Sequence, residues 1–98
     1  SPEERAQAVV PSQALRQAAA AVRGGERSAL ELAQAIRRQL ETAPLAQVQY
    51  TDIVDADTLQ PVETLVQDGS SGGRYLAAVA VYFGATRLID NTTLVVGE

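Results

Sequence analysis

The spacing of apolar residues changes once along this 98-residue chain, and that change limits the folds open to it. Up to Ala43, apolar residues recur every three or four positions, which is the repeat of an amphipathic helix. From Val48 onward, β-branched residues dominate and the pattern becomes that of strands. We therefore expect an α+β domain with about three N-terminal helices (about 1–43) packed on one face of a small, roughly three-stranded antiparallel sheet (about 48–96).

Proline, glycine and capping residues divide the helical half into three predicted helices. A serine and a proline at positions 1–2 are typical of a helix start. Pro11 has no backbone N–H to donate, so the first helix should end or kink near Val9. The glycines at 24–25 predict the end of the second helix, and Ser28 predicts the cap of the third.

The second half contains three stretches with strand character. Val48–Val54 is rich in β-branched residues. Tyr75–Phe83 is nearly continuously apolar, which suits a central strand covered on both faces; periodicity leaves a buried helix open, but its residue types favour the strand. Gly84–Thr86 predicts a hairpin that returns Arg87–Ile89 antiparallel to this strand. For Asn91–Val96 the sequence leaves two outcomes open, a short strand or a frayed end.

The composition excludes several classes of function. Without His, Cys or Lys, nucleophilic and acid–base chemistry would lack its usual groups, and a metal site could use only carboxylates. A net charge of −4 argues against binding nucleic acid, because contacts with phosphates need a basic surface. No apolar run approaches the roughly 20 residues of a membrane span. We expect a cytoplasmic protein with no nucleic-acid or membrane partner.

Two short strings resemble functional motifs, but a structural interpretation is favoured for both. Asp55, Asp57 and Thr58 differ from the phosphatase pattern Asp-x-Asp-x-Thr, because the threonine comes one residue early. They are more typical of a turn that ends a strand, and no further carboxylates lie nearby to complete a metal site. The Gly/Ser-rich run at 69–73 lacks the following helix that a phosphate-binding loop needs, so a flexible loop is favoured.

Arg87 and Asp90 follow the predicted hairpin and form a pair of interest. An arginine and a carboxylate at such a place can clamp the backbone or each other, or meet an anionic ligand. We favour a structural role, in which Arg87 braces the fold, because backbone carbonyls lie within reach of a residue directly after a tight turn.

Residues 50–59 read Y-T-D-I-V-D-A-D-T-L, and residues 84–91 read G-A-T-R-L-I-D-N. These segments resemble the two best-marked parts of the C-terminal domain of the pantothenate synthetase (pantoate–β-alanine ligase) family, Y-x-x-(I/L)-x-D-A-x-T-L and G-x-T-R-L-I-D-N. Residues 1–5 also resemble the point where that domain begins. The resemblance extends over nearly the whole chain, although the helices and the loop at 64–74 contribute little to it.

The resemblance implies a ligase that uses ATP and Mg²⁺ to adenylate pantoate, releasing pyrophosphate, and then joins it to β-alanine with release of AMP. In this family the catalytic residues lie in a Rossmann-like N-terminal domain and in the loop between the domains, while the C-terminal domain closes as a lid. We therefore expect these 98 residues to be that lid, inactive alone, binding no cofactor, with the N-terminal domain as their partner.

No catalytic, cofactor-binding or metal-ligating residue can be carried over from the family to this sequence. The positions that match family motifs, and that we expect to be structural or to face the lid's working surface, are Asp55, Thr58, Arg87, Asp90 and Asn91. A homodimer is one hypothesis for the full-length enzyme, whose oligomeric state the sequence leaves open. The alternative function is a free-standing interaction or regulatory module that binds a partner through an open sheet edge.

Overall fold

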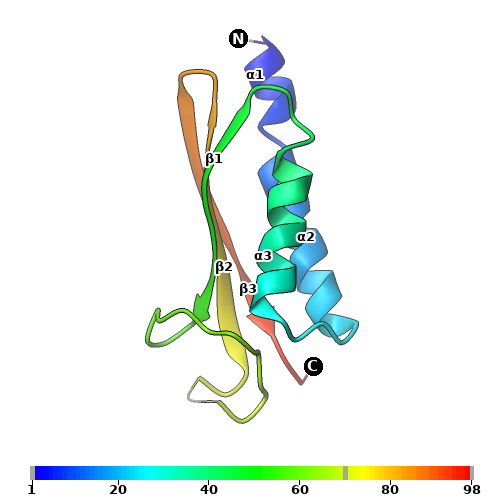
Figure 1. Ribbon diagram of the computed structural model, residues 1–98, viewed down its shortest axis with the longest axis vertical. Helices are drawn as coiled ribbons and strands as arrows, with labels where there is room; N and C mark the ends of the chain where they lie inside the picture. The colour runs from blue at the N-terminus through cyan, green and yellow to red at the C-terminus, as the bar shows by residue number, and fades with distance from the viewer. Residues whose placement is uncertain (1, 70, 98) are drawn as a thin grey trace.

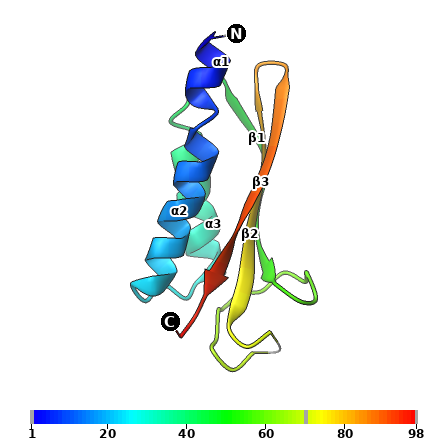
Figure 2. The same ribbon diagram turned by 180° about the vertical axis from the view of Figure 1, so that it is seen from behind.

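The computed structural model describes residues 2–69 and 71–97, and it consists of a helical layer and a sheet (Figure 1). In chain order the elements are α1 (Pro2–Gln7), α2 (Val10–Arg23), α3 (Ala29–Leu40), β1 (Ala46–Asp55), β2 (Arg74–Phe83) and β3 (Thr86–Val95). The strands form one antiparallel sheet in the order β1-β2-β3. The helix α3 lies against β1, and α2 lies against β3, as the view from behind shows (Figure 2). The expected α+β arrangement is confirmed.

The helices break where proline and capping residues predicted. The break between α1 and α2 falls at residues 8–9, and Pro11 is buried in the first turn of α2. Ser28 caps α3, because its hydroxyl oxygen accepts a hydrogen bond from the backbone N–H of Glu31 at 3.2 Å. Ser1, the predicted cap of the first helix, lies outside the described residues. In the described part of the chain, no helix is both long and apolar enough to cross a membrane.

The core lies between the helices and the inner face of β2. The inner residues of this strand are at most 2% exposed: Tyr75, Ala77, Val79, Val81 and Phe83. The expectation that β2 is covered on both faces was wrong for the described residues, since the helices lie on one face of the sheet only, as predicted for the sheet as a whole. Small side chains explain the continuous apolar run instead. On the outer face, Ala80 is fully buried because it lies between Tyr50 of β1 and Ile89 of β3.

The outer strands are longer than the sequence predicted. β3 pairs with β2 without interruption, from Thr86 opposite Phe83 to Val95 opposite Arg74. Of the stretch 91–96, which the sequence left undecided between a strand and a frayed end, residues 91–95 therefore form the second half of β3. β1 begins at Ala46 rather than at residue 48, and a β-bulge interrupts it after residue 48.

Candidate functional site

The turn after β1 is organised by the buried carboxylate of Asp55, which is 6% exposed. Its Oδ1 accepts hydrogen bonds from the backbone N–H groups of Asp57, at 2.8 Å, and Thr58, at 3.0 Å. Short-range bonds of this kind are the way an aspartate stabilises a tight turn. Its Oδ2 lies 3.1 Å from the hydroxyl of Ser71. One carboxylate therefore ties this turn to the loop that precedes β2.

The loop before β2 is anchored by residues that the sequence did not single out. Ser71 is 3% exposed, and its hydroxyl also lies within hydrogen-bond distance of the carbonyl oxygen of Arg74. The Nε of Arg74 in turn donates to the carbonyl of Ser71 at 3.1 Å. The hydroxyl of Tyr75 donates to the carbonyl of Val66 and accepts from its N–H, both at 3.0 Å. A serine among glycines carries no sequence signal for burial, so this anchoring emerges only from the fold.

The chemistry of the Asp55 cluster is that of a structural clamp. Two backbone N–H groups and a hydroxyl surround its carboxylate, and the chain has no histidine that could act as a base between Asp55 and Ser71. Within residues 2–69 and 71–97, no three His, Cys, Asp or Glu side chains gather closely enough to hold a metal ion. The arrangement supports turn formation rather than bond making.

The second segment that matches a family motif begins at the opposite end of the sheet, after the hairpin (Figure 1). Arg87 is exposed, and its Nε donates a hydrogen bond to Oε1 of Gln49 at 2.6 Å. Asp90 lies opposite Val79 on the face that the helices cover, and its Oδ1 accepts from the N–H of Asn91 at 2.8 Å. Because residues of a strand alternate between its two faces, the structure does not bring Arg87 and Asp90 together.

The structure thus separates the five motif positions into two groups. Asp55 and Thr58 share one turn, where the hydroxyl oxygen of Thr58 also accepts from the N–H of Gln60 at 3.2 Å. The other three positions lie along β3, two of them on its outer face and Asp90 on its inner face. They form no single catalytic constellation.

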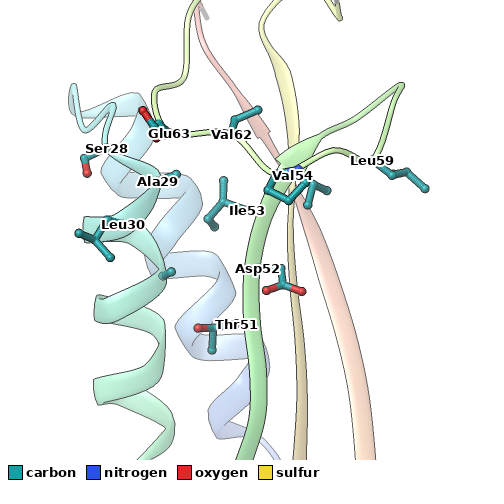
Figure 3. Close-up of a pocket in the computed structure, with 12 residues that line it drawn as sticks. Ser28, Ala29, Leu30, Thr51, Asp52, Ile53, Val54, Leu59, Val62 and Glu63 are labelled. Atoms are coloured by element: carbon teal, nitrogen blue, oxygen red, sulfur yellow. The ribbon is translucent and has the colours of Figure 1, made fainter.

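A groove along the free edge of β1 was missed by the sequence reasoning (Figure 3). It has a volume of about 660 Å³. One wall is the first half of α3, including Leu30, and the other is β1, from which Thr51 and Ile53 point toward the helix. The segment 61–63 closes one end. No local pattern reveals such a groove, because its walls meet only when the elements pack.

Residues 1–93 match the family model described as pantoate-beta-alanine ligase. The chain belongs to this ligase family. A pantothenate synthetase of Salinibacter ruber is 53% identical over 91 residues, which are 93% of this chain and 30% of that protein. A bifunctional pantoate ligase/cytidylate kinase of Synechocystis is 42% identical over 94 residues, or 18% of its length. The crystal structure of the pantothenate synthetase from Thermus thermophilus superposes with a TM-score of 0.78 at 30% identity, over 94% of this chain and 31% of that one.

This member of the pantoate–β-alanine ligase family spans about 30% of the length of the pantothenate synthetases it matches, and it corresponds to their C-terminal part. The groove does not fit the nucleotide expected for the family. Its lining residues include the acidic Asp52 and Glu63 and no arginine, whereas a polyphosphate needs positive charge or convergent N–H donors.

Proposed function

We propose that this chain is the C-terminal lid domain of a pantothenate synthetase that works in the cytoplasm. The observation that carries the proposal is the match of residues 1–93 to the ligase family, combined with the 30% share of the Salinibacter relative. A domain that matches only a third of a longer ligase is better explained as one part of such an enzyme than as a free-standing interaction module. The absence of His and Lys from the sequence agrees with a part that supplies no reacting group.

In this proposal a Rossmann-like N-terminal domain of the same polypeptide binds ATP and Mg²⁺. It adenylates the carboxylate of pantoate with release of pyrophosphate, and the amine of β-alanine then displaces AMP. The intermediate is an acyl adenylate, which water hydrolyses readily. A domain that closes over the site excludes water and keeps the intermediate for the amine.

The test compares three proteins: the full-length ligase that carries this chain, the same ligase without these 98 residues, and the 98 residues alone. Each is supplied with ATP, Mg²⁺, pantoate and β-alanine, and both AMP and pantothenate are quantified. We expect one AMP per pantothenate from the full-length ligase and no AMP from the 98 residues alone. The shortened ligase should release AMP in excess over pantothenate, because its adenylate is exposed to water.

Each alternative outcome contradicts a different part of the proposal. Turnover by the 98 residues alone, above a buffer blank, would show that they are not a lid. A full-length protein that forms no pantothenate would refute the proposed reaction. A shortened ligase that keeps the ratio of one AMP per pantothenate would show that the domain does not shield the intermediate.

A further inference from the structure

Within residues 2–69 and 71–97, the outer edge of β1 is paired with other backbone only at one end. Residues 60–62 lie beside this end, where the N–H of Val62 donates to the carbonyl of Ile53 at 3.4 Å. After residue 62 the segment turns away from β1 and toward α3. The carbonyl of Glu63 accepts from the N–H of Ala29, at the start of α3, at 2.9 Å. The pairing that residues 60–62 begin therefore stops after a short distance.

Beyond this point the edge of β1 presents backbone groups to a partner. The carbonyl of Ile53 faces outward, because it accepts from Val62. In an antiparallel strand the N–H and C=O of one residue point to the same side, and so do those of the residue two positions away. The N–H of Ile53 and both backbone groups of Thr51 therefore also face outward. Among the described residues, no backbone group outside the sheet pairs with them. The bulge between Val48 and Tyr50 ends this open stretch on its other side. The stretch is long enough for a short extended segment.

Apolar side chains flank the open edge on both faces of the sheet. On the helix side, Leu30 is 64% exposed at the rim of the groove. On the opposite side of β1, Leu59 is 59% exposed, and Figure 3 shows it directed away from α3. Its φ of 60° is one that a leucine rarely adopts, and the hydrogen bond from its N–H to the carbonyl of Asp55, at 2.9 Å, holds the turn there. A strand added to β1 would direct alternate side chains toward Leu30 and toward Leu59.

Negative charge beside the edge of β1 favours a segment that carries a basic side chain. Asp52 and Glu63 are both exposed, and no arginine lines the groove to neutralise them. About 70% of the length of these relatives lies outside the matched region, since the match is 30% of the length of the Salinibacter protein. That polypeptide must contact this domain if it is to act as a lid.

We propose that an extended segment of the ligase outside these 98 residues pairs with β1 between Tyr50 and Ile53 as a fourth strand. The segment carries apolar side chains that fill the groove and, on the outer face of the sheet, a lysine or arginine that meets Asp52. It holds the lid to the rest of the enzyme through main-chain hydrogen bonds, as in other cases of strand addition to an open edge. This inference rests on the proposed function, because it takes the partner from the same ligase.

Amide hydrogen exchange in the full-length ligase tests the added strand. The N–H groups of Thr51 and Ile53 should exchange roughly tenfold or more slowly than unpaired surface amides, because the added strand bonds them. Ala78 in the central strand serves as the reference for an intact sheet. If Thr51 and Ile53 exchange at the rate of unpaired amides while Ala78 is protected, the edge is open and the proposal is overturned.

Thr51→Pro removes the outward N–H without removing a bond to β2, since proline is tolerated at a strand edge. In the full-length ligase it should abolish the protection of Ile53 and leave that of Ala78 unchanged, whereas Thr51→Val, which keeps the N–H, should change neither. If Thr51→Pro also accelerates amide exchange at Ala78, the sheet itself is disturbed. Asp52→Lys then tests the added strand instead, because it leaves every backbone N–H in place. It should accelerate exchange at Ile53 by repelling a basic segment, and unchanged exchange at Ile53 would overturn the proposal.

Two further results separate this inference from its alternatives. Protection of Ile53 that rises with protein concentration would identify a second copy of the chain as the occupant and overturn the proposal. If the ligase forms pantothenate while the N–H of Ile53 exchanges freely, the added strand is refuted and the proposed function stands. If the N–H of Ile53 is protected but the protein has no ligase activity, the proposed function is refuted and the added strand stands.

Discussion

The two segments that match the family motifs are held in opposite ways. At the turn after β1, Asp55 is buried and its carboxylate accepts from two backbone N–H groups and lies beside the hydroxyl of Ser71. On β3, Arg87 is exposed and donates to the equally exposed side chain of Gln49. The first segment is explained by the fold itself. The second leaves an arginine on an open surface, where the rest of a ligase can reach it.

Both segments belong to strands that pair with the buried strand β2, so Val79→Asp in this strand should have the largest effect. Val79 is fully buried in β2, so the substitution places a carboxylate in the core without a partner. We expect it to lower the free energy of unfolding of this chain by roughly 3–5 kcal/mol, measured by urea denaturation. Ile89→Asp is the matched control on the outer face, where the side chain is 57% exposed, and it should cost far less. Equal losses would show that the two faces do not differ as described.

Asp55→Ala tests the structural half of the comparison. It removes the acceptor for two backbone N–H groups and leaves the buried hydroxyl of Ser71 with one acceptor fewer. We expect a loss of about 2–3 kcal/mol in the free energy of unfolding, since hydrogen bonds to charged groups are the stronger ones. Asp57→Ala is the control, because its ion pair with Arg74, at 3.5 Å, is exposed and should be worth at most about 1 kcal/mol. A loss for Asp57→Ala as large as that for Asp55→Ala would contradict the assignment of the clamp to Asp55.

Arg87→Ala tests the other half and should have the smallest effect. An exposed hydrogen bond to Gln49 is worth about 0.5 kcal/mol, so the melting temperature of this chain should fall only slightly. A double-mutant cycle with Gln49→Ala isolates the contribution of this bond. If Arg87→Ala instead costs about 2 kcal/mol, Arg87 braces the fold through more than Gln49, as the sequence favoured. If melting is unchanged while the full-length ligase loses turnover, Arg87 belongs to the working surface of the lid.

The sequence by itself determined the features that depend on near neighbours along the chain. Pro11 set the helix break because it has no N–H, Ser28 capped α3 because its hydroxyl reaches the N–H three residues ahead, and the change of apolar spacing near Val48 separated helices from strands. The resemblance of residues 50–59 and 84–91 likewise identified the ligase family, which the match over residues 1–93 confirmed. Each of these signals can be read within a window of about ten residues.

Only the tertiary structure decided the contacts between distant residues. Ser71 meets Asp55, and Arg87 meets Gln49, because the folded sheet and its loops bring together residues that lie 16 and 38 positions apart. The open edge of β1 has the same origin, since it depends on where residues 60–62 leave the strand to join the start of α3. Local propensity carries no information about strand register or about the point where a loop leaves a strand, because both are set by packing the whole sheet against its helices.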